Sequence, residues 1–375
     1  VYAGYYVVHK PLSPKNLQAL VNVSTDLLTW LAILAVATAL GSWLTKRLAY
    51  HSLLERFVFS AGLGLGVFSV LTFALGLVGL LYGWLFWALL IGGGLLLWRE
   101  FRDLGRALRQ ANRSRPRGRW STLLSLFIVT TLLLTLILAL LPPHEWDSLT
   151  YHLVGPARYL QAHRLTFQFD NYYLFFPSFT EMLFTAGMAL KGDVVPRLLH
   201  FSYLLLTLGA LGAFARRFWT RPLGLIAVAL FASIPTAIQI ATWSYVDLTL
   251  TFYNFAAIYA LLNWLPPSSS QQEHSTNENE ELVHPQSTGW LVLSGLFCSA
   301  AMSTKYTAVV SLLVMGAILF WELIRRRLSV RHFFTAGLLI AGLALAVAAP
   351  WYVKNAIVAG NPFYPLIWGG REWTE

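Results

Sequence analysis

Long apolar runs recur along the chain from Leu27 to Val353 and dominate its pattern. A helix of about 20 apolar residues is long enough to cross the hydrocarbon core of a bilayer. The runs place ten spans, at residues 27–45, 57–78, 80–98, 121–141, 198–214, 223–242, 245–265, 289–303, 306–324 and 333–351. We therefore expect an all-α polytopic membrane protein with about ten transmembrane helices.

The longest polar interruption, residues 142–197, predicts a large outer loop that carries short interfacial helices. Within it, Pro177–Leu190 is apolar but holds only 14 residues, and Glu181 interrupts it. A segment of that length favours an interfacial or re-entrant helix over a complete span.

Charge distribution orients these elements. The chain is 57% hydrophobic and 12% charged, and its net charge is +10. Of its 27 Lys and Arg residues, 18 fall on one set of alternating loops and 9 on the other. The richer side is predicted to be cytoplasmic, which puts loop 142–197 outside. The Arg99–Arg119 stretch lacks interleaved aromatics, so we expect no nucleic acid partner; its charge would attract anionic lipid.

Four sections are predicted along the chain. Residues 1–120 form an N-terminal three-span section with an Arg-rich cytoplasmic loop, and residues 121–265 a core with the outer loop. Residues 266–288 are polar and low in complexity, which is typical of a flexible cytoplasmic linker. Residues 289–375 add three spans and the start of an outer C-terminal segment, beyond which we expect the native protein to continue.

The segment His144–His152 follows the apolar run 123–141 and places ionisable groups where a membrane helix meets water. Asp147 and Tyr151 are one helical turn apart, and Arg158 falls on the same face of a predicted helix. A carboxylate here could reach both a lipid-borne and a soluble substrate. The alternative is that Asp147 only stabilises a helix N-terminus.

Further charged residues fall at the same outer face. Charges near a bilayer are costly and are usually functional or paired, so their convergence predicts a site. The candidates are Asp147, Asp170, Glu181, Arg197, Asp247, Lys305 and Lys354, with Tyr151 and His152 beside them. Six aromatic residues between 167 and 177 suit either an interfacial belt or a wall on which a sugar stacks.

No metal site is predicted. Four histidines lie near the outer face, at positions 144, 152, 163 and 200, but there is no H-E-x-x-H helix or tight ligand cluster. We expect no certain cofactor and leave a divalent cation open. The single cysteine, Cys298, excludes an intrachain disulfide.

Ordered motifs over about residues 120–368 resemble the GT-C glycosyltransferases, among them protein O-mannosyltransferases and the aminoarabinose transferases of lipid A. The similarity is carried, in chain order, by Trp146-Asp147-Ser148-Leu149-Thr150-Tyr151-His152-Leu153, Phe176-Pro177-Ser178-Phe179-Thr180-Glu181, Lys191-Gly192-Asp193, Pro196-Arg197, Tyr245-Val246-Asp247, Met302-Ser303-Thr304-Lys305-Tyr306, Pro350-Trp351-Tyr352-Val353-Lys354-Asn355 and Gly360-Asn361-Pro362-Phe363-Tyr364-Pro365. The chain departs from the mannosyltransferases where they carry adjacent Asp-Glu, since Ser148 follows Asp147 here.

The resemblance implies an inverting transfer from a polyprenyl-phosphate sugar to an acceptor hydroxyl, on the periplasmic or extracellular side of a bacterial inner membrane. Asp147 would be the general base. Substrate would be bound by Tyr151, His152, Asp170, Glu181, Arg197, Asp247, Lys305 and Lys354. The bilayer, the lipid-linked donor and other membrane proteins would be the partners.

Two other readings stay open. The chain could be a catalytically silent accessory subunit of a larger membrane complex, using its aromatic surface for packing. It could also be a transporter or flippase for a lipid-linked sugar. The sequence shows no broken-helix pairs of the kind that such transporters use, which counts against the last reading.

Overall fold

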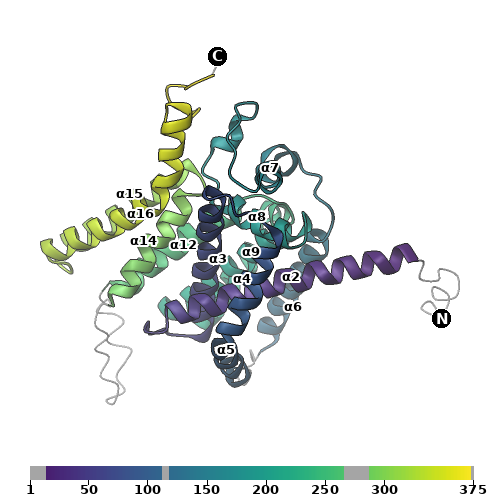
Figure 1. Cartoon of the computed structure of the whole chain (residues 1–375). Coiled ribbons are helices and arrows are strands. Elements are labelled where there is room, and N and C mark those ends of the chain that lie inside the picture. The colour runs from purple at the N-terminus through teal and green to yellow at the C-terminus, as the bar shows by residue number, and fades with distance from the viewer. Residues whose placement is uncertain (1–13, 112–117, 266–286, 373–375) are drawn as a thin grey trace, which may run out of the picture.

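A computed structural model describes residues 14–111, 118–265 and 287–372 (Figure 1). In these three ranges every regular element is a helix, and none is a strand. The predicted all-α polytopic fold is confirmed. Residues 266–286, most of the predicted linker, lie outside the described residues.

Six helices in the described part are long and apolar enough to span a membrane. They are α2 (Pro14–Leu44), α3 (Leu53–Leu77), α6 (Arg119–Ala139), α9 (Val194–Phe218), α15 (Val309–Ile324), which counts from Tyr306 with the preceding 3₁₀ turn, and α16 (Val330–Ala359). Two bent helix pairs raise the count to at most eight. The ten predicted spans therefore exceed what length and composition support.

The bent pairs are α4 (Gly83–Leu96) with α5 (Trp98–Ala111), which meet at 63°, and α10 (Arg221–Ala232) with α11 (Pro235–Ala241), which meet at 71°. Pro235 opens α11, and a proline cannot continue the hydrogen-bond ladder of the preceding helix. The expectation that the chain holds no broken-helix pairs was wrong, and residues 99–111, expected as loop, belong to a helix.

Two further predicted spans are shorter helices that lie inside the bundle. They are α12 (Asp247–Trp264) and α14 (Thr288–Met302), of 18 and 15 residues. A 15-residue helix is about 22 Å long, less than a hydrocarbon core. Both are mostly buried, and α14 packs between α12 and α16. Their neighbours within the protein, and not lipid, cover their apolar faces.

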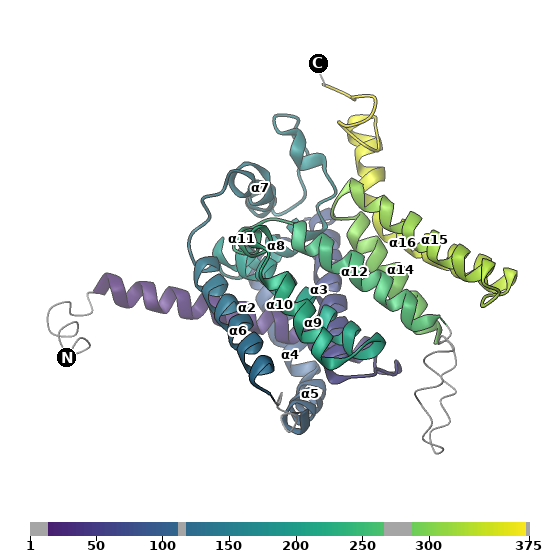
Figure 2. The same ribbon diagram turned by 180° about the vertical axis from the view of Figure 1, so that it is seen from behind.

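The predicted outer loop folds as four short elements: the π-helical turn η1 (Ser148–His152), α7 (Val154–Ala162), the 3₁₀ turn η2 (Tyr172–Phe175) and α8 (Phe179–Leu190). Figures 1 and 2 show α7 and the C-terminal segment at one end of the bundle and α5 at the opposite end. We call the α7 end the outer end. Helix α8 packs against α3, α7 and α9 with nearly all of its residues buried, so protein encloses it on every side.

Candidate functional site

The segment that carries Asp147 is anchored to α9 by Arg197. The Arg197 guanidinium donates to the carbonyls of Pro142 at 2.7 Å and Leu138 at 3.2 Å. Its Nη2 also lies 3.2 Å from Oε1 of Glu145, an ion pair without hydrogen-bond alignment. Both side chains are enclosed, at 1% and 4% exposure. Arg197 therefore fixes the chain two residues before Asp147, and its buried Nε has no hydrogen-bond partner among the described residues.

Asp147 itself is half-buried at the start of η1. The Tyr151 hydroxyl donates a hydrogen bond to its carboxylate, and the Tyr245 phenol hydrogen-bonds its backbone. Burial, followed by the negative charges of Asp147, Glu181 and Asp247, raises the pKa of the Tyr151 phenol. The phenol thus remains a donor at neutral pH, with three carboxylates within its electrostatic reach.

His152 and Glu181 form a buried pair next to Tyr151. His152 Nδ1 lies 2.7 Å from Oε1 of Glu181, with side-chain exposures of 3% and 11%. The Tyr151 ring contacts the His152 ring at 4.1 Å between centroids. Glu181 comes from α8, so this pair attaches the Asp147 segment to the buried short helix.

Asp247 and Lys305 form the open ion pair of the site. Lys305 Nζ donates to Oδ1 of Asp247 at 2.7 Å, and the side chains are 39% and 38% exposed. His200 of α9 supports the start of α12, because its Nε2 accepts the Leu248 amide at 3.1 Å. Asp147, Asp247 and Lys305, which are far apart in the sequence, therefore lie in one cluster.

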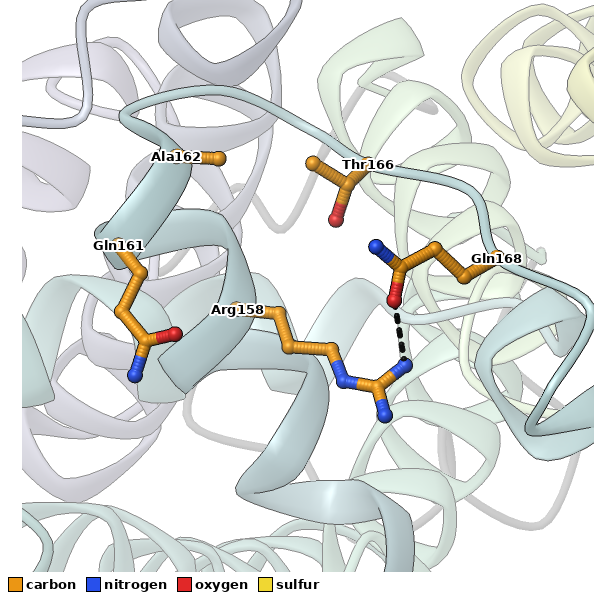
Figure 3. A pocket seen from close by; sticks show the side chains of 5 residues that line it. All are labelled: Arg158, Gln161, Ala162, Thr166 and Gln168. Atoms are coloured by element: carbon orange, nitrogen blue, oxygen red, sulfur yellow. Dashed lines mark hydrogen bonds between the residues drawn. The ribbon is translucent and has the colours of Figure 1, made fainter.

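Asp170 lies away from that cluster. It forms a bidentate pair with Arg158 of α7, at 2.9 and 2.7 Å, on the exposed surface. The Arg158 hydrogen bond lowers the pKa of Asp170. Arg158 therefore does not join Asp147 and Tyr151 as their helical spacing predicted, because the π-helical turn changes the phase. It lines a polar surface hollow with Gln161, Ala162, Thr166 and Gln168 (Figure 3).

Lys354 is held against the aromatic segment by α16. Its Nζ donates to the Phe175 carbonyl at 3.3 Å and lies 5.4 Å from the ring centres of Phe167 and Phe175. The adjacent Asn355 donates to the same carbonyl at 2.8 Å. The outer loop and the C-terminal segment are therefore packed together.

A chain of aromatic rings links Asp147's neighbour Tyr151 to α16. Tyr173 stacks on Tyr151 at 4.7 Å, and the contacts continue through Phe176, Tyr306 and Tyr352. Tyr245 and Tyr306 were not among the predicted site residues. Their positions beside the Asp247 and Lys305 motifs were the available signal.

Several buried hydroxyl and carboxylate oxygens around this cluster have no hydrogen-bond partner among the described residues. Leaving such groups unpaired costs free energy, so each needs a partner that the fold does not supply. They are Ser148 Oγ, Thr180 Oγ1, Glu181 Oε2, Ser244 Oγ, Thr249 Oγ1 and Ser303 Oγ.

No group of three or more His, Cys, Asp or Glu in the described ranges could hold a metal ion. The divalent cation that the sequence left open stays untested. What the fold and cluster define is a polytopic helical membrane protein with a polar, carboxylate-rich site at one end of its bundle.

The sequence profile of the dolichyl-phosphate-mannose-protein mannosyltransferase family matches residues 166–361, just over half of the chain. The protein belongs to this family, and it is thus a membrane glycosyltransferase; the resemblance to GT-C enzymes is confirmed. The matched range contains Glu181, Asp247 and Lys305 but begins after Asp147.

A curated relative supports no finer assignment. The chain is 28% identical over 141 residues to an uncharacterized protein of Shigella flexneri, SF2093/S2215, covering 36% of this chain and 70% of the relative. No solved structure matches the chain significantly.

Proposed function

We propose that the protein transfers a sugar from a polyprenyl-phosphate donor to an acceptor hydroxyl, with Asp147 as the general base. The observation that carries the proposal is the position of the Asp147 carboxylate. It is half-buried, hydrogen-bonded by Tyr151, and in the same cluster as the open Asp247–Lys305 pair. A general base needs this combination of access to substrate and fixed orientation.

In the proposed step, the acceptor oxygen attacks the anomeric carbon while Asp147 takes the hydroxyl proton. The bond from the anomeric carbon to the phosphate oxygen breaks, and the lipid phosphate leaves with the electron pair. Attack opposite to the leaving group inverts the anomeric centre. In this proposal the Tyr151 hydroxyl restrains the Asp147 carboxylate, which leaves its other lone pairs for the acceptor proton.

Lys305 is the proposed partner of the donor phosphate. An ammonium group has three donors, and the structure uses one of them on Asp247. The other two have no partner among the described residues, and we propose that they stabilise the charge that develops on the leaving phosphate. Just beyond Lys305, α15 exposes Val309, Val310 and Leu313, which offer an apolar face for the polyprenyl tail.

We place the site on the non-cytoplasmic side. The uneven distribution of basic residues supports this orientation. A cysteine introduced at position 168 should react with an impermeant thiol reagent only when the reagent is applied from outside. The native Cys298 is buried and should add little background labelling. Labelling from the cytoplasmic side alone would contradict the orientation and the site together.

The decisive experiment compares Asp147→Asn with the wild type in transfer from polyprenyl-phosphate sugars. We expect a fall in rate of about 10²–10⁴, the usual contribution of a general base, with donor binding retained. Asp103→Asn is the matched control, because Asp103 is exposed on α5 at the far end of the bundle. Equal rates for Asp147→Asn and wild type would refute the mechanism.

The accessory-subunit hypothesis makes the opposite prediction. The wild type would then transfer no sugar from any donor tested and would copurify with other membrane subunits. Mass spectrometry of copurifying lipids and proteins distinguishes the two outcomes.

A further inference from the structure

Aromatic and basic side chains gather at the end of the bundle opposite Asp147. We define this aromatic–basic patch as Trp43, Lys46 and Arg47 at the end of α2, and Trp98, Arg99 and Arg102 at the start of α5. Lys46 Nζ lies 5.8 Å from the Trp43 ring, and the Arg102 guanidinium lies 4.6 Å from the Trp98 ring. All six side chains are exposed.

The two helix ends are joined by polar contacts that remove the nearby acid from the surface. Ser42 of α2 donates to Glu100 of α5 at 3.3 Å, and Arg56 of α3 lies 3.9 Å from the same carboxylate. Glu100 is thus turned inward and paired. The charged side chains that α5 exposes are basic, apart from Asp103, which pairs with Arg106.

The preceding helix, α4, indicates where the patch would lie relative to a bilayer. Helix α4 exposes Ile91, Leu95 and Leu96, an apolar face suited to lipid tails, and the chain then turns by 63° into α5. Trp98 and the arginines follow directly, so a bilayer whose tails cover this face of α4 would place its headgroups beside them. Tryptophan favours that interface, and guanidinium groups bind phosphate through paired N–H donors.

We propose that this patch binds the headgroups of anionic glycerophospholipids. A basic face that is only solvated needs no aromatic partners, whereas here each tryptophan holds a cation beside it. The arrangement recurs at the end of α15, where Arg325 lies 4.8 Å from the exposed Trp321. Positive charge, an interfacial ring and an apolar face above it together match a phospholipid with a charged headgroup.

The test uses the full-length protein in detergent, titrated with phosphatidylglycerol or phosphatidylcholine and followed by native mass spectrometry. The variant is Lys46→Gln/Arg99→Gln/Arg102→Gln. The control, Arg164→Gln/Lys191→Gln/Arg371→Gln, removes the same charge from exposed positions elsewhere. Equal melting temperatures of the three proteins would establish that all are folded.

We expect the wild type to prefer phosphatidylglycerol and the patch variant to lose at least about tenfold of that preference. Each basic residue near an anionic surface contributes about 1 kcal/mol, and 1.4 kcal/mol is tenfold, so three residues set an upper limit of about a hundredfold. The control should stay within about twofold of wild type. An unchanged preference in the patch variant, or an equal loss in the control, would overturn the proposal.

Discussion

Two ion pairs at the outer end of the bundle differ in one property, their enclosure. Arg197–Glu145 is sealed, with side chains 1% and 4% exposed, whereas Lys305–Asp247 is open, at 39% and 38%. The Arg197 Nη atoms contact two carbonyls and a carboxylate, whereas the Lys305 ammonium contacts only Asp247 among the described residues. A sealed pair cannot exchange partners without leaving a charge in the interior, but an open pair can. We therefore propose a structural role for the first pair and a role in donor binding for the second.

The largest effect should come from breaking the sealed pair. Arg197→Met leaves the buried Glu145 carboxylate with only the His144 amide and imidazole beside it, each at 3.3 Å. Removing one partner of a buried ion pair costs about 3–5 kcal/mol of stability. The double variant Arg197→Met/Glu145→Leu should recover much of that loss. Thermal and chemical unfolding of the purified protein measures both. If Arg197→Met is as stable as wild type but binds the sugar donor weakly, Arg197 is a phosphate ligand. The structural role proposed for the Arg197–Glu145 pair would then be wrong.

Breaking the open pair should affect binding and spare the fold. Lys305→Met removes the ammonium group that we propose hydrogen-bonds the phosphate of the sugar donor. Hydrogen bonds to charged groups contribute about 1.5–3 kcal/mol, so the KM for the polyprenyl-phosphate sugar should rise about 10- to 100-fold. The melting temperature should hardly change. The charge swap Asp247→Lys/Lys305→Asp restores an ion pair but places the cation at position 247. Its transfer activity should therefore stay low, which separates phosphate binding by Lys305 from a role of the ion pair in folding. Wild-type KM in Lys305→Met would remove Lys305 from the site.

A smaller effect is expected at Tyr151. Tyr151→Phe keeps the ring stacked on Tyr173 and removes the hydroxyl that holds Asp147. Water can replace this hydrogen bond at a half-buried carboxylate, so we expect a loss of about 0.5–1.5 kcal/mol, or about 2- to 10-fold in kcat. Steady-state kinetics with saturating donor would measure it. A fall as large as that of Asp147→Asn would instead make Tyr151 part of the chemistry.

The exposed pair Arg158–Asp170 should matter least. Asp170→Asn should cost well under 1 kcal/mol, because both groups meet solvent. Arg158 lowers the pKa of Asp170 in the fold, so this small stabilisation is present at neutral pH and is lost as pH falls through the lowered pKa. Melting temperatures of the two proteins should therefore converge in acid. A difference that grows on acidification would contradict the sign of the shift.

Hydrophobic patterning predicted the all-α membrane fold because a run of about 20 apolar residues can cross a bilayer as a helix whatever the rest of the chain does. It could not predict where helices end or bend. The predicted span over 80–98 stops at Leu96 and turns into α5, and Pro235 interrupts another. Helices such as α14 are too short to cross by themselves, and only the neighbours packed on them explain why they are apolar.

The sequence by itself determined which chemistry is present at the outer end: the one-turn spacing of Asp147 and Tyr151, and the placing of Asp247 and Lys305 on one side. The tertiary structure alone decided which of the charges are enclosed. Arg197 and Lys305 look equivalent in the sequence, as cations beside helix ends. Their difference arises because burial depends on what packs over a side chain from distant segments, and no local pattern records that.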